Sequence, residues 1–324
     1  MPDGSTAELL DRRLHFVVGK GGVGKTTVAA ALAQCTARLG RRTLAVEMDV
    51  TGRLPAVLGL SGAAVVTPRF VGENLAVVSI DGRAALEEYL GLIVPVKRLL
   101  HTVFSSRVYQ YFVAAAPGLK ELMTIGKIWY EVTRVENGRP AWDAVVVDAP
   151  ATGHSLQYLR MPQAARETFG TGLVQREAAK IVDLLQDPRT TGVHLVTLAE
   201  EMPVAETLET CEQLRGPLDL PLGWIVANRL HWRRFDPETL AALEAASTRE
   251  PDGKLLASVA DRAAEEAGWT AINQANLERL RAGVAGTPII ELPYLFAEEF
   301  DADELRSLSG IIEATVAPRT GGAS

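Results

Sequence analysis

The sequence predicts a doubly wound, mostly parallel α/β sheet, and two features of its 324 residues support this fold. First, short apolar runs rich in β-branched residues recur along the chain, and strands that are hydrophobic throughout are typical of parallel sheets covered by helices on both faces. Second, helical stretches separate these runs, and such alternation favours a doubly wound sheet of seven or eight strands. The predicted strands cover residues 14–18, 43–47, 75–80, 144–147, 193–198, 223–227 and 288–292.

Composition limits the classes of protein to consider. Hydrophobic residues make up 47% of the chain and charged residues 23%, which are proportions of a globular protein and exclude wholesale disorder. The net charge of −7 argues against a nucleic-acid partner, because phosphate binding needs clustered Lys and Arg. Cys35 and Cys211 are far apart, which predicts no disulfide framework or zinc site. With neither a signal peptide nor a long uncharged apolar run, we expect a cytoplasmic protein.

We expect residues 1–324 to form a single domain with a helical subdomain inserted on one side of the sheet. Two intervals without strand-like runs, residues 83–136 and about 162–186, carry apolar residues at helical spacing. The dipeptide Pro117-Gly118 should divide the first interval into two helices. The small, polar tail at residues 317–324 is expected to be disordered.

A glycine-rich loop follows the first predicted strand. Residues 19–26 read G-K-G-G-V-G-K-T, which fits G-x-x-x-x-G-K-[ST] between a strand and the predicted helix 27–39. The glycines let backbone N–H groups surround phosphate, and the helix directs its positive end at the same anion. Lys25 should contact the β- and γ-phosphates, while the Thr26 hydroxyl should ligate Mg²⁺. The motif therefore predicts Mg·ATP bound by Gly21, Gly22, Val23, Gly24, Lys25, Thr26 and Thr27.

Two acidic residues follow predicted strands and should lie near that loop. Asp148 comes directly after strand 144–147, where a carboxylate can hold Mg²⁺ through water; a helix-capping role is the alternative. Asp49 follows strand 43–47 and is the candidate for positioning or deprotonating the attacking water, although an Asp is also common in turns. Glu47 lies within the strand, which favours a structural role.

Several motifs resemble one family of ATPases. K-G-G-V-G-K-T-T at residues 20–27 resembles the deviant Walker A motif, and residues 145–159 read V-V-V-D-A-P-A-T-G-H-S-L-Q-Y-L. The second run is similar to V-V-x-D-T-A-P-T-G-H-T-L-R-x-L of the arsenite-pump ATPases and the eukaryotic targeting factor for tail-anchored membrane proteins. Pro117-Gly118-Leu119 with Glu121 resembles the P-G-x-x-E helix start of that family. The order of elements agrees over roughly residues 14–315.

The resemblance implies properties that the motifs alone do not show. Members form ATP-sandwich dimers, in which the lysine matched by Lys20 reaches the nucleotide of the partner; a solvated surface lysine is the alternative. Asn228 matches the adenine-reading Asn of the family, and an amide suits the edge of that base, although a strand-end turn would also explain it. The adenine-flanking loop of the family matches Pro293, Tyr294 and Leu295.

The sequence also departs from the family. Asp49 is followed by Val-Thr-Gly-Arg where the family usually has D-P-A-H, so hydrolysis or its coupling to the helices should differ. No C-x-x-C pair is present, and neither Cys35 nor Cys211 matches the metalloid-binding cysteines, so arsenite transport is not predicted.

The favoured function is a dimeric Mg·ATP-dependent switch, assembled from two copies or with a paralogue, and coupled to a hydrophobic or membrane-protein client. Met123, Ile125, Ile128, Trp129, Val103, Phe104 and residues 109–113 either line a groove for that client or pack the helices. One alternative is a partition- or positioning-type ATPase, which should carry a basic face or a terminal amphipathic helix. Another is a nucleotide-binding regulatory subunit of a heterodimer.

Overall fold

The structure is a computed structural model that describes residues 9–48, 50–61, 63–93, 118–247 and 253–316. Its strands are β1 (Leu14–Gly19), β2 (Thr43–Glu47), β3 (Arg69–Phe70), β4 (Leu75–Ser79), β5 (Val135–Glu136), β6 (Arg139–Pro140), β7 (Ala144–Asp148), β8 (Thr191–Leu198), β9 (Leu222–Leu230) and β10 (Ile289–Pro293). Its helices are α2 (Lys25–Arg38), α3 (Arg53–Val57), α4 (Gly82–Ile93), α7 (Leu119–Thr133), α8 (Thr152–Thr168), α9 (Leu173–Gln186), α10 (Glu201–Arg215), α11 (Pro237–Ser247), α12 (Gly253–Gly283) and α13 (Ala302–Val316).

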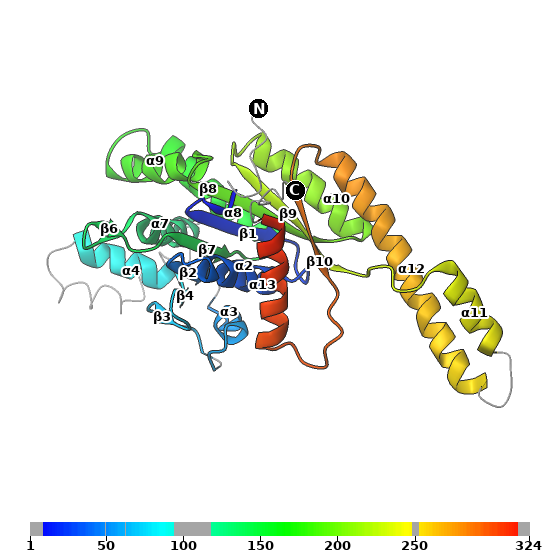
Figure 1. Cartoon of the computed structure of the whole chain (residues 1–324). Helices are drawn as coiled ribbons and strands as arrows, with labels where there is room; N and C mark the ends of the chain where they lie inside the picture. Colours follow the sequence, from blue (N-terminus) through cyan, green and yellow to red (C-terminus); the bar gives the residue numbers. More distant parts are fainter. Residues whose placement is uncertain (1–8, 49, 62, 94–117, 248–252, 317–324) are drawn as a thin grey trace, which may run out of the picture.

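Within these residues, eight strands form one sheet in the order β10-β9-β8-β1-β7-β2-β4-β3 (Figure 1). Every pairing is parallel except that of β3 with β4, which confirms the predicted α/β class. Each of the seven predicted runs overlaps one of these strands. Strand β3 and the separate β5–β6 hairpin were not predicted, because strands of two residues carry no recognisable periodicity.

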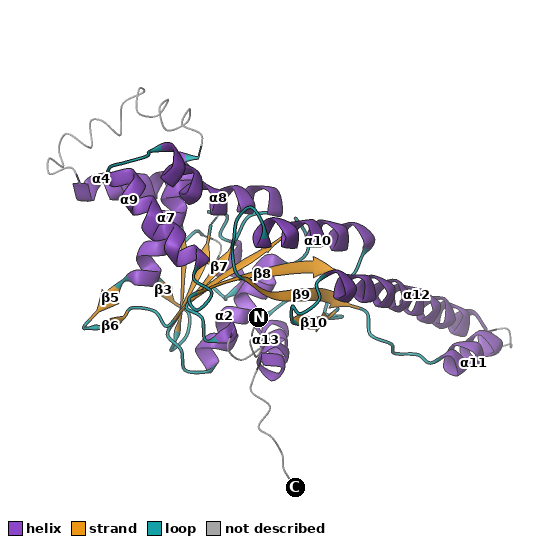
Figure 2. Ribbon diagram, turned by 90° about the horizontal axis from the view of Figure 1, so that it is seen from above, coloured by secondary structure: helices purple, strands orange, loops and turns teal. Residues whose placement is uncertain are grey.

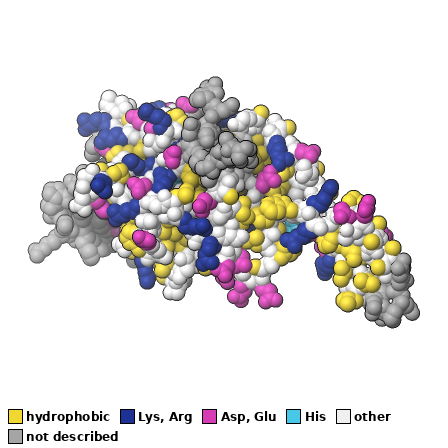
Figure 3. All heavy atoms as spheres, in the orientation of Figure 1, with side chains coloured by type: hydrophobic (Ala, Val, Ile, Leu, Met, Phe, Trp, Pro, Cys, Tyr) yellow, Lys and Arg dark blue, Asp and Glu magenta, His cyan; other side chains and the backbone are white. Residues whose placement is uncertain are grey.

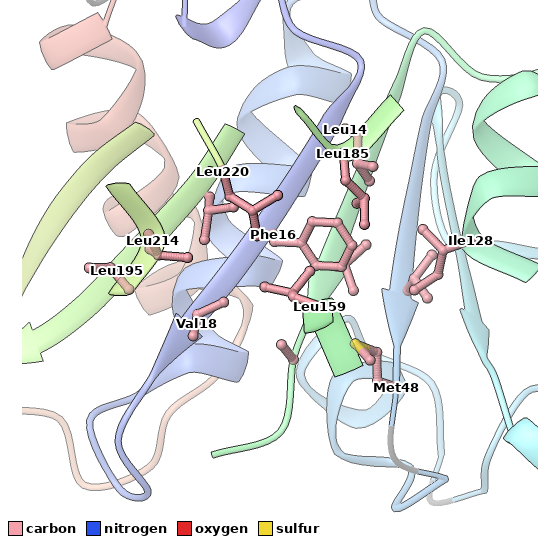
Figure 4. Packing of buried hydrophobic residues seen from close by; sticks show 14 of the residues in the cluster. Leu14, Phe16, Val18, Met48, Ile128, Leu159, Leu185, Leu195, Leu214 and Leu220 are labelled. Atoms are coloured by element: carbon pink, nitrogen blue, oxygen red, sulfur yellow. The ribbon is translucent and has the colours of Figure 1, made fainter. Parts of the chain in front are cut away.

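Helices cover both faces of the sheet, as parallel strands require (Figure 2). On one face, Leu14, Phe16 and Val18 of β1 pack against residues of α8, α9 and α10 (Figure 4). On the other face, Val17 packs with α2, α3 and α13. Alternate residues of β1 therefore belong to different hydrophobic clusters, which fixes the register of this central strand.

Strand order places the carboxyl end of β1 at a topological switch point. The chain leaves β1 toward β2 on one side, returns through β7, and then crosses to β8 on the other side. Ligands of open α/β sheets bind outside the carboxyl ends of strands at such a point. The register sets Asp148 of β7 beside Val17 of β1 and Glu47 of β2, so the predicted site residues share this edge.

The two intervals without strand-like runs contain α4, α7, α8 and α9, although residues 135–136 of the first belong to β5. Helix α7 begins after Gly118, whose φ of 81° is left-handed. Helix α8 begins at Thr152, well before the predicted interval, and contains Pro162. Residues 103, 104 and 109–113 and the tail 317–324 lie outside the described residues.

Helices α11 and α12 form an arm that projects from the body (Figures 1 and 2). No residue of α11 is buried, and α12 is 31 residues long. Apolar side chains are exposed along the arm and gather where it joins the body (Figure 3). Trp232 and Phe296 are among the exposed large apolar residues. None of the helices in the described part of the chain has the length and apolar character needed to cross a membrane.

Candidate functional site

The predicted phosphate-binding loop opens into a cavity of about 470 Å³ at the carboxyl edge of the sheet. This cavity brings together predicted residues from three separate segments: the glycine-rich loop, the end of β7 and the loop after β2. Its lining comprises Gly21, Gly22, Gly24, Lys25, Thr26, Glu47, Thr51, Arg53, Asp148, Ala149, Pro150, Ala151, His154 and Arg229. Thr27 is half-buried in the first turn of α2 and does not belong to this set.

Gly24 has to be glycine for two independent reasons. Its φ is 90°, in the left-handed region, and a Cβ there would lie 2.4 Å from Nδ2 of Asn228. That Nδ2 donates a hydrogen bond of 2.8 Å to the backbone oxygen of Val23, which is buried. The predicted adenine-reading residue is therefore in contact with the phosphate-binding loop, and the loop has no room for a side chain at its turn.

Lys25 begins helix α2, whose amino end faces the cavity. Its Nζ donates a hydrogen bond of 3.0 Å to the backbone oxygen of Lys20. The Lys25 side chain thus reaches back across the glycine-rich loop to Lys20. Both its ammonium and the helix end present positive charge to the cavity. Thr26 lies beside it in the same lining.

Lys20 points away from this lining. Its Nζ lies 2.5 Å from Oε1 of Glu206 on α10, and the two side chains are 41% and 36% exposed. The lysine that the family resemblance assigns to a partner's nucleotide is therefore held by an ion pair within its own subunit.

Glu47 anchors the loop that follows β2. The buried carboxylate accepts hydrogen bonds from the Thr51 hydroxyl and from the Ser79 hydroxyl, at 2.8 and 2.7 Å. It also accepts from the backbone N–H groups of Gly52, Arg53 and Leu54. These five donors hold the loop and the start of α3 against the sheet, and they occupy both oxygens of Glu47.

Asp148 ends β7 and is 8% exposed, with its carboxylate at the edge of the cavity that Thr26 also lines. Asp49, the candidate for activating water, lies outside the described residues. Of the described residues near it in the sequence, Glu47 and Thr51 line this cavity.

The charge of the cavity suits a polyanion. Lys25, Arg53 and Arg229 supply three cationic side chains, against the carboxylates of Asp148 and Glu47, the latter already engaged by five donors. Neither Arg53 nor Arg229 was predicted to belong to the site, because single arginines after a turn or a strand match no motif. Their signal was positional, since Arg229 directly follows Asn228 and Arg53 lies four residues after Asp49.

The predicted adenine-flanking segment meets the root of the arm. Pro293 ends β10, and the N–H of Tyr294 donates to the backbone oxygen of Leu230 at 2.9 Å. The Tyr294 ring stacks on His231 with centroids 4.8 Å apart, and His231 pairs with Glu266 of α12 at 2.9 Å. Leu295, the third predicted residue, is partly buried against the hydrophobic cluster that includes residues of α2 and α13. His231, which received no predicted role, therefore joins this segment to the arm.

The two cysteines offer no metalloid site. Burial raises the pKa of the Cys35 thiol to about 12 and that of Cys211 to about 11, so neither is a thiolate near neutral pH. Within the part of the chain that the structure describes, no three His, Cys, Asp or Glu residues gather as a metal site would need.

An apolar recess of about 350 Å³ lies among α4, α7 and α9. Met123 and Trp129 line it, together with Tyr130, Val174 and Ile181. Ile125 and Ile128 are each 1% exposed and belong to the main core. From the sequence these residues were expected either to line a groove or to pack the helices. Ile125 and Ile128 pack in the core, whereas Met123 and Trp129 are partly buried against that core and also line the recess.

Comparison with known proteins finds one family and a group of related ATPases. The anion-transporting ATPase family matches residues 12–177. The ATPase BagA of Mycobacterium tuberculosis is 34% identical over 234 residues, which cover 71% of this chain and 68% of that protein. An arsenical pump-driving ATPase of Acidiphilium multivorum is 25% identical over 321 residues, 92% of this chain and 53% of that protein. An arsenical pump-driving ATPase of Escherichia coli is 31% identical over 227 residues, 67% of this chain and 35% of that protein.

Proposed function

The chain belongs to the anion-transporting ATPase family and hydrolyses ATP, and from this premise we propose that it is a Mg²⁺-dependent switch that dimerises around its nucleotide. The observation that carries this proposal is the cavity in which the glycine-rich loop, Lys25 and Asp148 meet. A polyanion fits there because the amino end of α2 and three cationic side chains surround it.

The residues present also fit a nucleotide-bound magnesium ion. The Thr26 hydroxyl and the Asp148 carboxylate are oxygen ligands of the kind Mg²⁺ prefers, and they line one cavity. When bound, Mg²⁺ neutralises phosphate charge at the phosphoryl group that ATP transfers to water. Lys25 binds the phosphates, Asn228 orients the base, and Asp49 positions or deprotonates the water. Glu47 holds the intervening loop through its five hydrogen bonds.

In the dimer, the role of Lys20 is to bind the phosphate of the partner's nucleotide. In the single subunit this lysine is paired with Glu206, so it has to exchange a carboxylate for the phosphate of a partner's nucleotide. Phosphate carries more negative charge than one carboxylate, and the exchange becomes favourable only when a nucleotide-loaded partner is present. Lys20 thereby makes assembly depend on nucleotide. The partner is a second copy of this chain or a paralogous subunit.

The client that we propose is an apolar segment of a membrane protein. The recess among α4, α7 and α9 offers it Met123, Trp129 and Ile181, which are adaptable or bulky apolar contacts. Arsenite is not the proposed cargo, because both cysteines are buried and protonated. The acidic net charge likewise disfavours a DNA-partitioning role.

The proposal is tested by the rate of ATP hydrolysis per protomer over a range of protein concentrations. A dimeric switch gives a rate that rises with concentration and then saturates. The Lys20→Ala variant should stay at the low rate throughout while binding a fluorescent ADP analogue as the wild type does. A wild-type rate per protomer that is constant and high in the monomeric range would refute the dimer requirement. A low, constant rate that only a paralogous subunit raises would assign the second subunit to that paralogue.

A further inference from the structure

Arg229 has an unusual backbone conformation for its residue type. Its φ is 56°, and the other described non-glycine residues with positive φ are Asn137 and Asp219. Asn and Asp tolerate this left-handed region because their short side chains bond locally, whereas an Arg there costs roughly 1–2 kcal/mol. The sequence thus keeps a costly conformation at the position that directly follows Asn228.

The left-handed residue changes the direction of the side chains at the end of β9. In a regular strand, neighbouring side chains point to opposite faces of the sheet. Here Asn228 reaches the backbone of Val23 in the phosphate-binding loop, and Arg229 lines the cavity that the same loop forms. The kink at Arg229 therefore allows two consecutive side chains to serve one site, which regular strand geometry would prevent.

Protein contacts do not account for the position of the Arg229 side chain. Its guanidinium makes no hydrogen bond and no ion pair with any residue among those that the structure describes. By contrast, Arg41 donates to backbone oxygens, and Arg42 pairs with Glu136. Arg229 shares its cavity with the cations Lys25 and Arg53 and with the carboxylates of Glu47 and Asp148, but it forms an ion pair with neither carboxylate.

We propose that Arg229 binds the phosphate chain of the nucleotide, as a further cation beside Lys25. This inference rests on the proposed function, because it takes the cavity to be the ATP site. A guanidinium presents a planar set of donors that matches phosphate oxygens, and contact with them repays the backbone strain. Asn228 then reads the base and Arg229 holds the phosphates, so one strand end recognises both parts of the nucleotide.

A glycine at position 229 separates the effect of backbone strain on stability from the effect of the guanidinium on nucleotide binding. Arg229→Gly removes the guanidinium and also relieves the left-handed strain, so the urea midpoint should rise while Mg·ADP and Mg·ATP bind about tenfold more weakly. Adenosine, which lacks phosphates, should bind with unchanged affinity. Arg229→Lys keeps the charge and should recover part of the loss. Asp219→Gly is the matched control, since it relieves a positive φ in a turn that does not line the cavity and should leave nucleotide affinity unchanged.

Isothermal titration calorimetry of each variant with Mg·ADP and with adenosine tests whether Arg229 binds the phosphates. Arg229→Gly that binds Mg·ADP as tightly as wild type overturns the assignment, and so does an equal loss for adenosine, which would mean a distorted base site. If the glycine variant is poorly folded, Arg229→Gln, which keeps the backbone strain and removes the charge, gives the same comparison. A wild-type protein that binds no adenine nucleotide would refute the proposed function itself, a result distinct from failure at Arg229.

Discussion

The ion pair between Lys20 and Glu206 gives a quantitative prediction about assembly. Replacing Glu206 by Gln removes the carboxylate that holds Lys20 inside its own subunit, at 2.5 Å from its Nζ. The freed ammonium should be available to the nucleotide of a partner. We therefore expect Glu206→Gln to strengthen the nucleotide-dependent dimer, although the substitution lies outside the cavity lining.

The magnitude follows from the exposure of the pair. Both side chains are more than a third exposed, and such pairs contribute about 0.2–1 kcal/mol after solvent screening. Two of them break when a symmetric dimer forms, so the dissociation constant should fall by a factor between about 2 and about 30. The effect should shrink at high salt, because exposed ion pairs are screened.

Sedimentation velocity over a protein titration, with saturating Mg·ADP and fluoroaluminate, measures this constant. Glu209→Gln is the matched control, since it removes the same charge from the same helix without touching Lys20. A second comparison combines Glu206→Gln with Lys20→Ala and should show no gain. Dimerisation of Glu206→Gln that is unchanged or weaker than wild type would refute the role of Glu206 as an opposing contact.

Three further predictions concern binding, turnover and stability. Lys25→Ala should weaken Mg·ATP binding by about 100-fold or more, because an ammonium that contacts two phosphates is lost; calorimetry showing normal affinity would contradict the site. Asp49→Asn should retain binding and stop turnover, so a steady-state rate equal to wild type would remove its assigned role. Burial lowers the pKa of His15 to about 3 and that of His194 well below its usual value, and the two rings share a hydrogen bond of 3.0 Å. Since only the unfolded chain protonates them below about pH 6.5, the free energy of unfolding should fall by roughly 2–3 kcal/mol from pH 7 to pH 5.5 through this pair. Urea titrations at both pH values test this, and an equal fall in the His15→Gln/His194→Gln double variant would contradict it.

Much of the fold was predictable because its signal is local. Runs such as 144–147 are apolar at every position, and both faces of the resulting strand are buried. The arm was not predicted, because α11 buries none of its residues and so carries no amphipathic pattern. The short edge strand β3 was missed for a related reason, since both of its residues are exposed.

The candidate site likewise has parts that the sequence predicts and parts that it does not. The glycine-rich loop and the residues after β7 form contiguous motifs, so both could be recognised from the sequence, and the structure places them in one cavity. Glu206 lies 186 residues from Lys20, and no periodicity connects them. Arg229 adjoins a predicted residue, but its place in the site depends on a left-handed φ. An arginine in the sequence gives no sign of such a backbone conformation. Contacts between distant segments and strained backbone therefore needed the structure.

The measurement that tests the nucleotide-dependent switch most directly is the solution mass by light scattering, without nucleotide and with Mg·ADP plus fluoroaluminate. The 34.9 kDa chain should be monomeric alone and about twice that mass with the phosphate mimic, and Lys20→Ala should remain monomeric in both conditions. A wild-type chain that binds the nucleotide and stays at its monomer mass would contradict a switch made of two copies. A mass that doubles equally in Lys20→Ala would contradict the role of Lys20 in joining them.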